Sequence, residues 1–173
     1  MNKTDDLRDR FTGLRGRVGW VGLGNPAWSD DGFGVRLATA LARLGVADVV
    51  VAGNGLEAYA GRLATGNFDH LVFLDAVEFG ESPGAVIWLS SGEIVARFPQ
   101  VSTHKIGLGV LARLIESNHR TRCWLLGCQP ASLRDHEGLT PAVRQTLDRV
   151  LNMILQWFHA DTAPPSFSEV SLC

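Results

Sequence analysis

The stretch GLGNPAWSDDGFG, Gly22 to Gly34, decides the fold, because it joins an apolar segment to an amphipathic one through a glycine-rich turn. The residues before the turn, RVGWVGLG at 17–24, form a short apolar run ending in glycines, which is typical of a buried strand. After the turn, apolar residues recur at helical spacing from Phe33 to Leu44, and Gly45 ends the pattern. The stretch therefore predicts a strand, a tight turn and a helix over 31–44.

The rest of the chain continues this alternation of strands and helices. Apolar runs predict four more strands at 48–52, 69–77, 84–89 and 122–128. Helices are expected over 105–118 and from about 140 to 158, with a weaker helical segment at 56–65. The linker EFGESP at 78–83 is too short for a parallel crossover, so the fourth strand should run antiparallel to its neighbour. We expect an α/β three-layer sandwich, with a mostly parallel twisted sheet of about five strands and helices on both faces.

Length and composition predict one soluble domain. The 173 residues suffice for a single core, which we place at 17–160, between a flexible lead at 1–16 and a disordered tail at 161–173. The net charge of −2 gives no reason to expect nucleic acid as a partner. The sequence has no apolar run long enough to predict a membrane span. Three cysteines and a charged N-terminus without a signal-peptide pattern favour the cytoplasm.

The glycines of the opening stretch also fit the loose form of a dinucleotide-binding loop. However, Asp30 and Asp31 stand where a pyrophosphate would rest and would repel it. The acid expected at the end of the second strand is missing, since Asp48 stands at its start. We therefore expect no nucleotide. A simpler role for the two acids is to cap the helix that follows them.

Topology brings two further polar residues to the edge of the sheet where this turn lies. Asp75 ends the third strand, in LVFLDA, and His104 lies in VSTHKIG, just before the helix at 105–118. Taken singly, Asp75 could be a loop carboxylate and His104 a solvated residue. Together with Asp31 they form a set of two carboxylates and one imidazole, which suits zinc, nickel, manganese or cadmium. Three protein ligands would leave positions open for something brought by a substrate.

Four motifs in series, GLGNPAWSDDGFG, FLDAVEFGESPG, STHKIGL and LLGCQP…GLTPAV, resemble those of the hydrogenase maturation endopeptidases over about residues 18–158. In that family an acid at the position of Asp31 (Glu in some members), the acid at Asp75 and the histidine at His104 bind a metal. The resemblance implies removal of a short C-terminal extension from the nickel-loaded large-subunit precursor of a nickel–iron hydrogenase. It also implies a nickel ion that the substrate carries, with zinc or cadmium as surrogates, and assigns recognition and catalysis to these three residues.

No side-chain nucleophile with a base is evident in the sequence. Ser29 lies near the expected site without a Ser–His–Asp arrangement, and Cys128 could approach it but has no obvious base. A metal-bound water or a metal-polarised carbonyl is then the expected route to hydrolysis. The alternative is a non-enzymatic metal-binding checkpoint or chaperone module for hydrogenase assembly, with the same ligands and no cleavage.

Overall fold

The computed structural model describes residues 3–98, 107–117, 120–135 and 138–162, and in these residues five strands form one sheet in the order β2-β1-β3-β5-β4. The strands are β1 (Val18–Leu23), β2 (Val49–Gly53), β3 (His70–Ala76), β4 (Val86–Ser90) and β5 (Arg122–Cys128). Neighbouring strands are parallel except for β4, which pairs antiparallel with β5 at one side of the sheet. The predicted strands and the predicted antiparallel fourth strand are confirmed.

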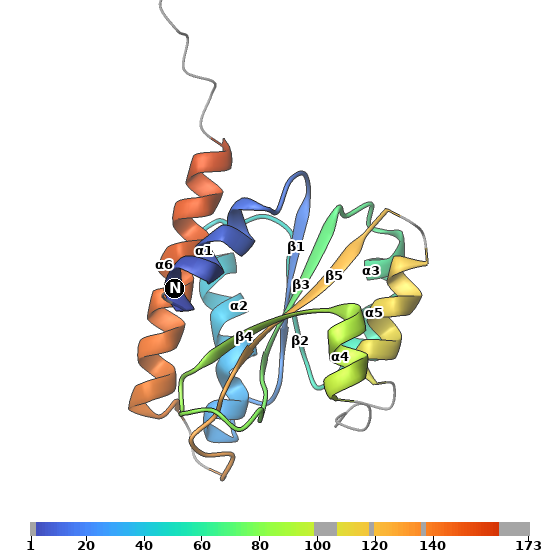
Figure 1. The fold of residues 1–173 in the computed structure, drawn as a ribbon. Coiled ribbons are helices and arrows are strands. Elements are labelled where there is room, and N and C mark those ends of the chain that lie inside the picture. The colour runs from blue at the N-terminus through green and yellow to red at the C-terminus, as the bar shows by residue number, and fades with distance from the viewer. Residues whose placement is uncertain (1–2, 99–106, 118–119, 136–137, 163–173) are drawn as a thin grey trace, which may run out of the picture.

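Helices cover both faces of this sheet, as Figure 1 shows. One face carries α1 (Lys3–Thr12), α2 (Phe33–Arg43) and α6 (Pro141–Thr162). The other carries η2 (Leu56–Tyr59), α3 (Ala60–Thr65), α4 (Ser91–Arg97) and α5 (Leu108–Glu116). A separate cluster of buried apolar side chains fills the space on each side of the sheet, so the predicted three-layer α/β sandwich is confirmed.

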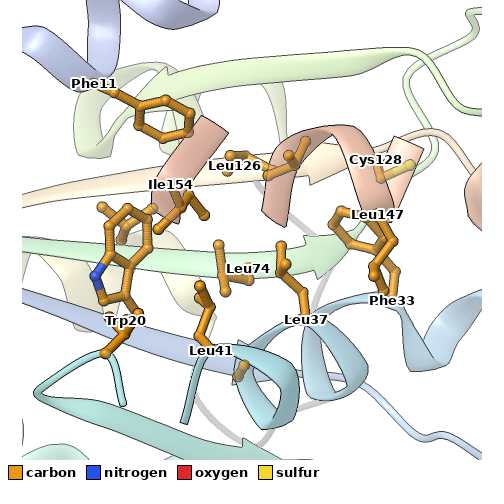
Figure 2. Packing of buried hydrophobic residues seen from close by; sticks show 14 of the residues in the cluster. Phe11, Trp20, Phe33, Leu37, Leu41, Leu74, Leu126, Cys128, Leu147 and Ile154 are labelled. Carbon is orange, nitrogen blue, oxygen red and sulfur yellow. The ribbon is translucent and has the colours of Figure 1, made fainter. Parts of the chain in front are cut away.

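The core on the α2 and α6 side sets the position of the helix that follows the glycine-rich turn. Figure 2 shows Phe33, Leu37 and Leu41 of α2 facing Leu74 of β3. These α2 residues are fully buried and recur at intervals of four, which is why the helical spacing was legible in the sequence. Packing of this face fixes the start of α2 above the ends of the strands.

The N-terminal segment departs from the flexible lead expected over residues 1–16. Residues 3–12 form α1, and Leu7, Phe11 and Leu14 are buried in the core on the α6 side of the sheet. The Phe11 ring packs edge-on against Trp20 and Trp88, with ring centroids 6.1 and 5.6 Å apart. The domain therefore begins earlier than residue 17, because these apolar side chains at helical spacing find partners on the sheet. The tail expected at 161–173 lies almost wholly outside the described residues and stays a prediction.

Helix α2 approaches the sheet so closely that its second residue must be glycine. A β-carbon added to Gly34 would lie 1.9 Å from the carbonyl oxygen of Leu74 and 2.6 Å from that of Leu23. The start of α2 thus rests against the ends of β1 and β3. This contact holds the preceding turn, with its two acids, directly over the carboxyl edge of the sheet.

Replacing this glycine should therefore destabilise the fold. We expect Gly34→Ala to lower the free energy of unfolding by about 3 kcal/mol, because the helix must move away from two strands. Gly61→Ala is the matched control, since no atom lies within 4 Å of its added β-carbon and the position is helical. That control should be neutral or slightly stabilising. Urea unfolding measures both, and equal stability of the two variants would contradict the close contact.

Candidate active site at the carboxyl edge of the sheet

The turn between β1 and α2 is built around Asn25. Its backbone N–H donates to Oδ2 of Asp31 at 2.7 Å, and its side-chain oxygen accepts from the N–H of Ala27 at 3.0 Å. Its carbonyl accepts from Trp28 N at 3.1 Å, and the Trp28 carbonyl accepts from Asp31 N at 3.0 Å. These bonds fold the turn back on itself. They fix the Asp31 carboxylate at the rim of the sheet, where it is half-buried.

Asp30 and Asp31 are neighbours in sequence with different roles. Asp30 is fully buried and accepts hydrogen bonds from Ala131 N, Ser132 N and Thr140 N at 2.8, 3.1 and 2.7 Å. The hydroxyl of Thr140 donates a further bond at 2.9 Å. Asp30 therefore ties the turn to the loop between β5 and α6. Neither acid caps the helix through its side chain, so the capping role considered from the sequence is wrong.

Asp75 lies near the end of β3, opposite Gly127 of β5. One of its oxygens accepts from the N–H of Ala76 at 2.9 Å. Burial, and then the negative charge of Asp31, raise the pKa of the Asp75 carboxyl to about 8. No cationic side chain among the described residues forms an ion pair with either acid. Two carboxylates close enough to interact, with no counter-ion among the described residues, are ligands of the kind that a divalent metal cation takes.

The third expected ligand, His104, lies outside the described residues. Helix α5 ends at Glu116, whose carboxylate accepts from the N–H of Cys123 at the start of β5 at 2.8 Å. The opposite end of α5, next to Gly107, therefore faces the carboxyl edge of the sheet. Within the described part of the chain, no three His, Cys, Asp or Glu side chains form a group that could hold a metal ion. That part supplies the carboxylates Asp31 and Asp75, and the role of His104 stays a prediction.

Gln129 is a further residue of this edge that no local sequence pattern singles out. Its side-chain oxygen accepts hydrogen bonds from three successive backbone N–H groups, those of Phe79, Gly80 and Glu81, at 2.8, 3.1 and 3.3 Å. These bonds shape the loop that follows β3 and Asp75. Gln129 itself is buried directly after β5, so one side chain couples two loops that border the carboxylate pair.

The two cysteines in the described part of the chain are not available as nucleophiles. Cys128 is buried in the core, and burial raises the pKa of its thiol to about 12. Burial also raises the pKa of the Cys123 thiol. Ser29 is 2 % exposed, and no histidine among the described residues donates to it or accepts from it. Hydrolysis at this edge would therefore use water rather than one of these three side chains.

Comparison with known proteins gives consistent matches. A family model described as "Hydrogenase maturation protease" matches residues 35–157. The Hydrogenase 2 maturation protease of Escherichia coli is 31 % identical, with 80 % of this chain and 88 % of that protein covered. The hydrogenase expression/formation protein HupD of Rhodobacter capsulatus is 30 % identical, with 76 % and 66 % covered.

Solved structures agree with these sequence matches. The crystal structure of the [NiFe] hydrogenase maturation protease HycI from Thermococcus kodakarensis superimposes with a TM-score of 0.77 at 30 % identity, covering 88 % of this chain and 98 % of that one. The maturating endopeptidase HybD of Escherichia coli superimposes with a TM-score of 0.71 at 27 % identity, covering 85 % and 94 %. Within the described residues, no helix has both the length and the apolar character needed to cross a bilayer.

Proposed function

This chain belongs to the family of hydrogenase maturation proteases, and from that membership we propose that it removes a short C-terminal extension from the nickel-loaded large-subunit precursor of a nickel–iron hydrogenase. Membership makes the chain a hydrolase of peptide bonds that acts on a hydrogenase precursor. The finer proposal concerns how the precursor is recognised. We place the reaction in the cytoplasm, which fits the two free, buried cysteines of the described chain.

The carboxylate pair is the observation that carries this proposal. Asp31 and Asp75 lie close enough for the charge of Asp31 to raise the pKa of Asp75, and no described side chain neutralises them. A cation held by the precursor would relieve this repulsion, whereas a precursor without metal would not. The pair therefore favours a substrate that brings its own nickel. His104 would complete the set with an imidazole, and zinc or cadmium are expected surrogates.

Nickel bound between the precursor and these residues would also place the scissile peptide bond. A metal ion that contacts the carbonyl oxygen draws electrons from the carbonyl carbon and makes it open to attack. Water then adds to that carbon, the carbon–nitrogen bond breaks, and the leaving nitrogen takes up a proton. In this scheme Asp31, Asp75 and His104 position the metal, and no described cysteine or serine forms a covalent intermediate.

Cleavage of purified precursor, with and without nickel, tests the proposal. The purified chain is mixed with the large-subunit precursor of the nickel–iron hydrogenase of the same organism, and mass spectrometry follows the loss of the C-terminal extension. We expect cleavage of the nickel-loaded precursor and none of the nickel-free precursor. Equal cleavage of both would contradict recognition through nickel. Binding of the loaded precursor without any cleavage would favour the checkpoint module instead.

A further inference from the structure

A groove lined by arginines lies between α2 and α6, beside the turn that carries Asp31. The two helices lie next to each other on one face of the sheet in Figure 1. The groove has a volume of about 540 Å³ and begins at Pro26, within the turn itself. Arg36 and Arg43 of α2 and Arg144 of α6 line it, and none of the described residues lining it is acidic. The groove is therefore a concentration of positive charge on a chain whose net charge is −2.

Arg36 connects the groove to the candidate site. One of its terminal nitrogens donates to the carbonyl of Pro26 at 3.1 Å, one residue after Asn25, whose N–H holds Asp31. The Nε of Arg36 is buried and has no hydrogen-bond partner among the described residues. A buried donor without a partner is uncommon in folded proteins and is relieved when an acceptor arrives. The guanidinium of Arg36 thus has an unused donor in a groove that begins at the site.

The other two arginines have no acidic partner in the described part of the chain. Neither Arg43 nor Arg144 forms an ion pair with any described residue, in contrast to Arg17, which holds Asp48 at 2.6 Å. Apolar side chains line the same groove, including Leu44, which is 54 % exposed. Guanidinium groups bind carboxylates in pairs of parallel hydrogen bonds. The groove is complementary to a peptide segment that carries carboxylates next to apolar residues.

We propose that this groove docks an acidic segment of the hydrogenase large-subunit precursor while its cleavage site lies against Asp31 and Asp75. The inference rests on the proposed function, because that function has a protein as its substrate. A protein substrate is large enough to contact the groove while its cleavage site lies at the carboxylate pair. The groove would add affinity and speed of association through long-range attraction, without touching the reacting bond. It would therefore affect how much precursor is captured at low concentration rather than how fast captured precursor is cleaved.

Charge reversal tests this docking surface. The double variant Arg43→Glu/Arg144→Glu is compared with wild type in cleavage of nickel-loaded precursor, at about 50 mM and about 500 mM NaCl. We expect KM to rise about tenfold or more at low salt while kcat changes by less than about twofold. High salt should raise the KM of the wild type and so reduce the difference in KM between the wild type and the double variant. Arg43→Lys/Arg144→Lys keeps the charges and should retain most of the wild-type KM.

Arg113→Glu on α5 is the matched control, because it reverses an exposed arginine on the other face of the sheet. It should leave KM unchanged, and thermal unfolding of all variants checks that they are folded. If wild type cleaves and the folded double variant keeps its KM, the groove is not a docking surface while the proposed function stands. If the control raises KM as much as the double variant, KM responds to the net charge of the protein rather than to charges in the groove. The groove is then ruled out as a docking surface. If wild type cleaves no precursor, the proposed function fails and the inference falls with it.

Discussion

Asp75→Asn is expected to abolish processing of the nickel-loaded precursor and at the same time to make the free protein more stable at neutral pH. The amide keeps the shape of the side chain and an oxygen that can accept from Ala76 N, so the end of β3 should be undisturbed. It removes the negative charge with which Asp75 would bind the cation. We expect the rate of cleavage to fall about a thousandfold or more, since metal ligands contribute several kcal/mol to such reactions.

The stability effect follows from the pKa of Asp75. Burial and Asp31 raise it to about 8 in the folded chain, whereas an unfolded aspartate titrates near about 3.9. Between these values the folded state binds more protons than the unfolded state, so the wild type loses stability as pH rises through this window. The asparagine side chain at position 75 does not titrate, so the variant does not lose this stability as pH rises. Its advantage should be small at about pH 4 and reach about 2 kcal/mol at pH 8, less than the full shift would give, because Asp75 as a whole residue is only partly buried.

Urea unfolding of wild type and Asp75→Asn at several pH values, in the presence of a chelator, measures this difference. Asp148→Asn is the control, because it makes the same acid-to-amide change at an exposed position on α6, outside the candidate site. A variant that is inactive and less stable than wild type at pH 8 would show that Asp75 supports the fold. A variant that is more stable and inactive separates function from stability at this residue.

Much of the fold could be predicted from the sequence because its three central strands, β1, β3 and β5, are largely buried on both faces. Such strands appear as short apolar runs, and the short predicted linker at 78–83 excluded a parallel crossover before β4. Two helices were missed for different reasons. The apolar residues of α1 are few and stand among charged ones, and only their partners on the sheet show that the segment packs. Helix α4 begins with a capping box between Ser90 and Glu93, so its start has a local signal in the sequence, but its seven residues are too few for a clear apolar periodicity.

The candidate site could be predicted in part, because topology alone places Asp31 and Asp75 at one edge of a parallel sheet. The different roles of Asp30 and Asp31 could not be predicted. The groups that surround Asp30 come from residues 101 to 110 positions away, in the loop between β5 and α6. The same holds for Gln129, whose partners lie 48 to 50 positions earlier. Local sequence patterns carry no information on such distant partners, whereas the packing of α2 onto the sheet and the pairing of β3 with β5 bring them together.

Asp30→Asn is expected to have the largest effect on stability of any single change at the turn. The two carboxylate oxygens accept four hydrogen bonds from described residues, one at Oδ1 and three at Oδ2. An asparagine has one oxygen, and its NH₂ group would face donors where the second oxygen stood. At least one buried backbone N–H would lose its acceptor and meet another donor. We expect a loss of about 3 kcal/mol in the free energy of unfolding.

The adjacent residue provides the control for this prediction. Asp31 is half-buried and accepts one described hydrogen bond, from Asn25 N, which the oxygen of an asparagine can still accept. The free energy of unfolding of Asp31→Asn should therefore lie within about 1 kcal/mol of the wild-type value, while the variant loses the ability to process precursor. Urea unfolding and the cleavage assay, applied to both variants, separate the two roles. If Asp31→Asn were as unstable as Asp30→Asn, the two acids would share a structural role. That result would contradict the proposal that Asp31 and Asp75 bind a metal.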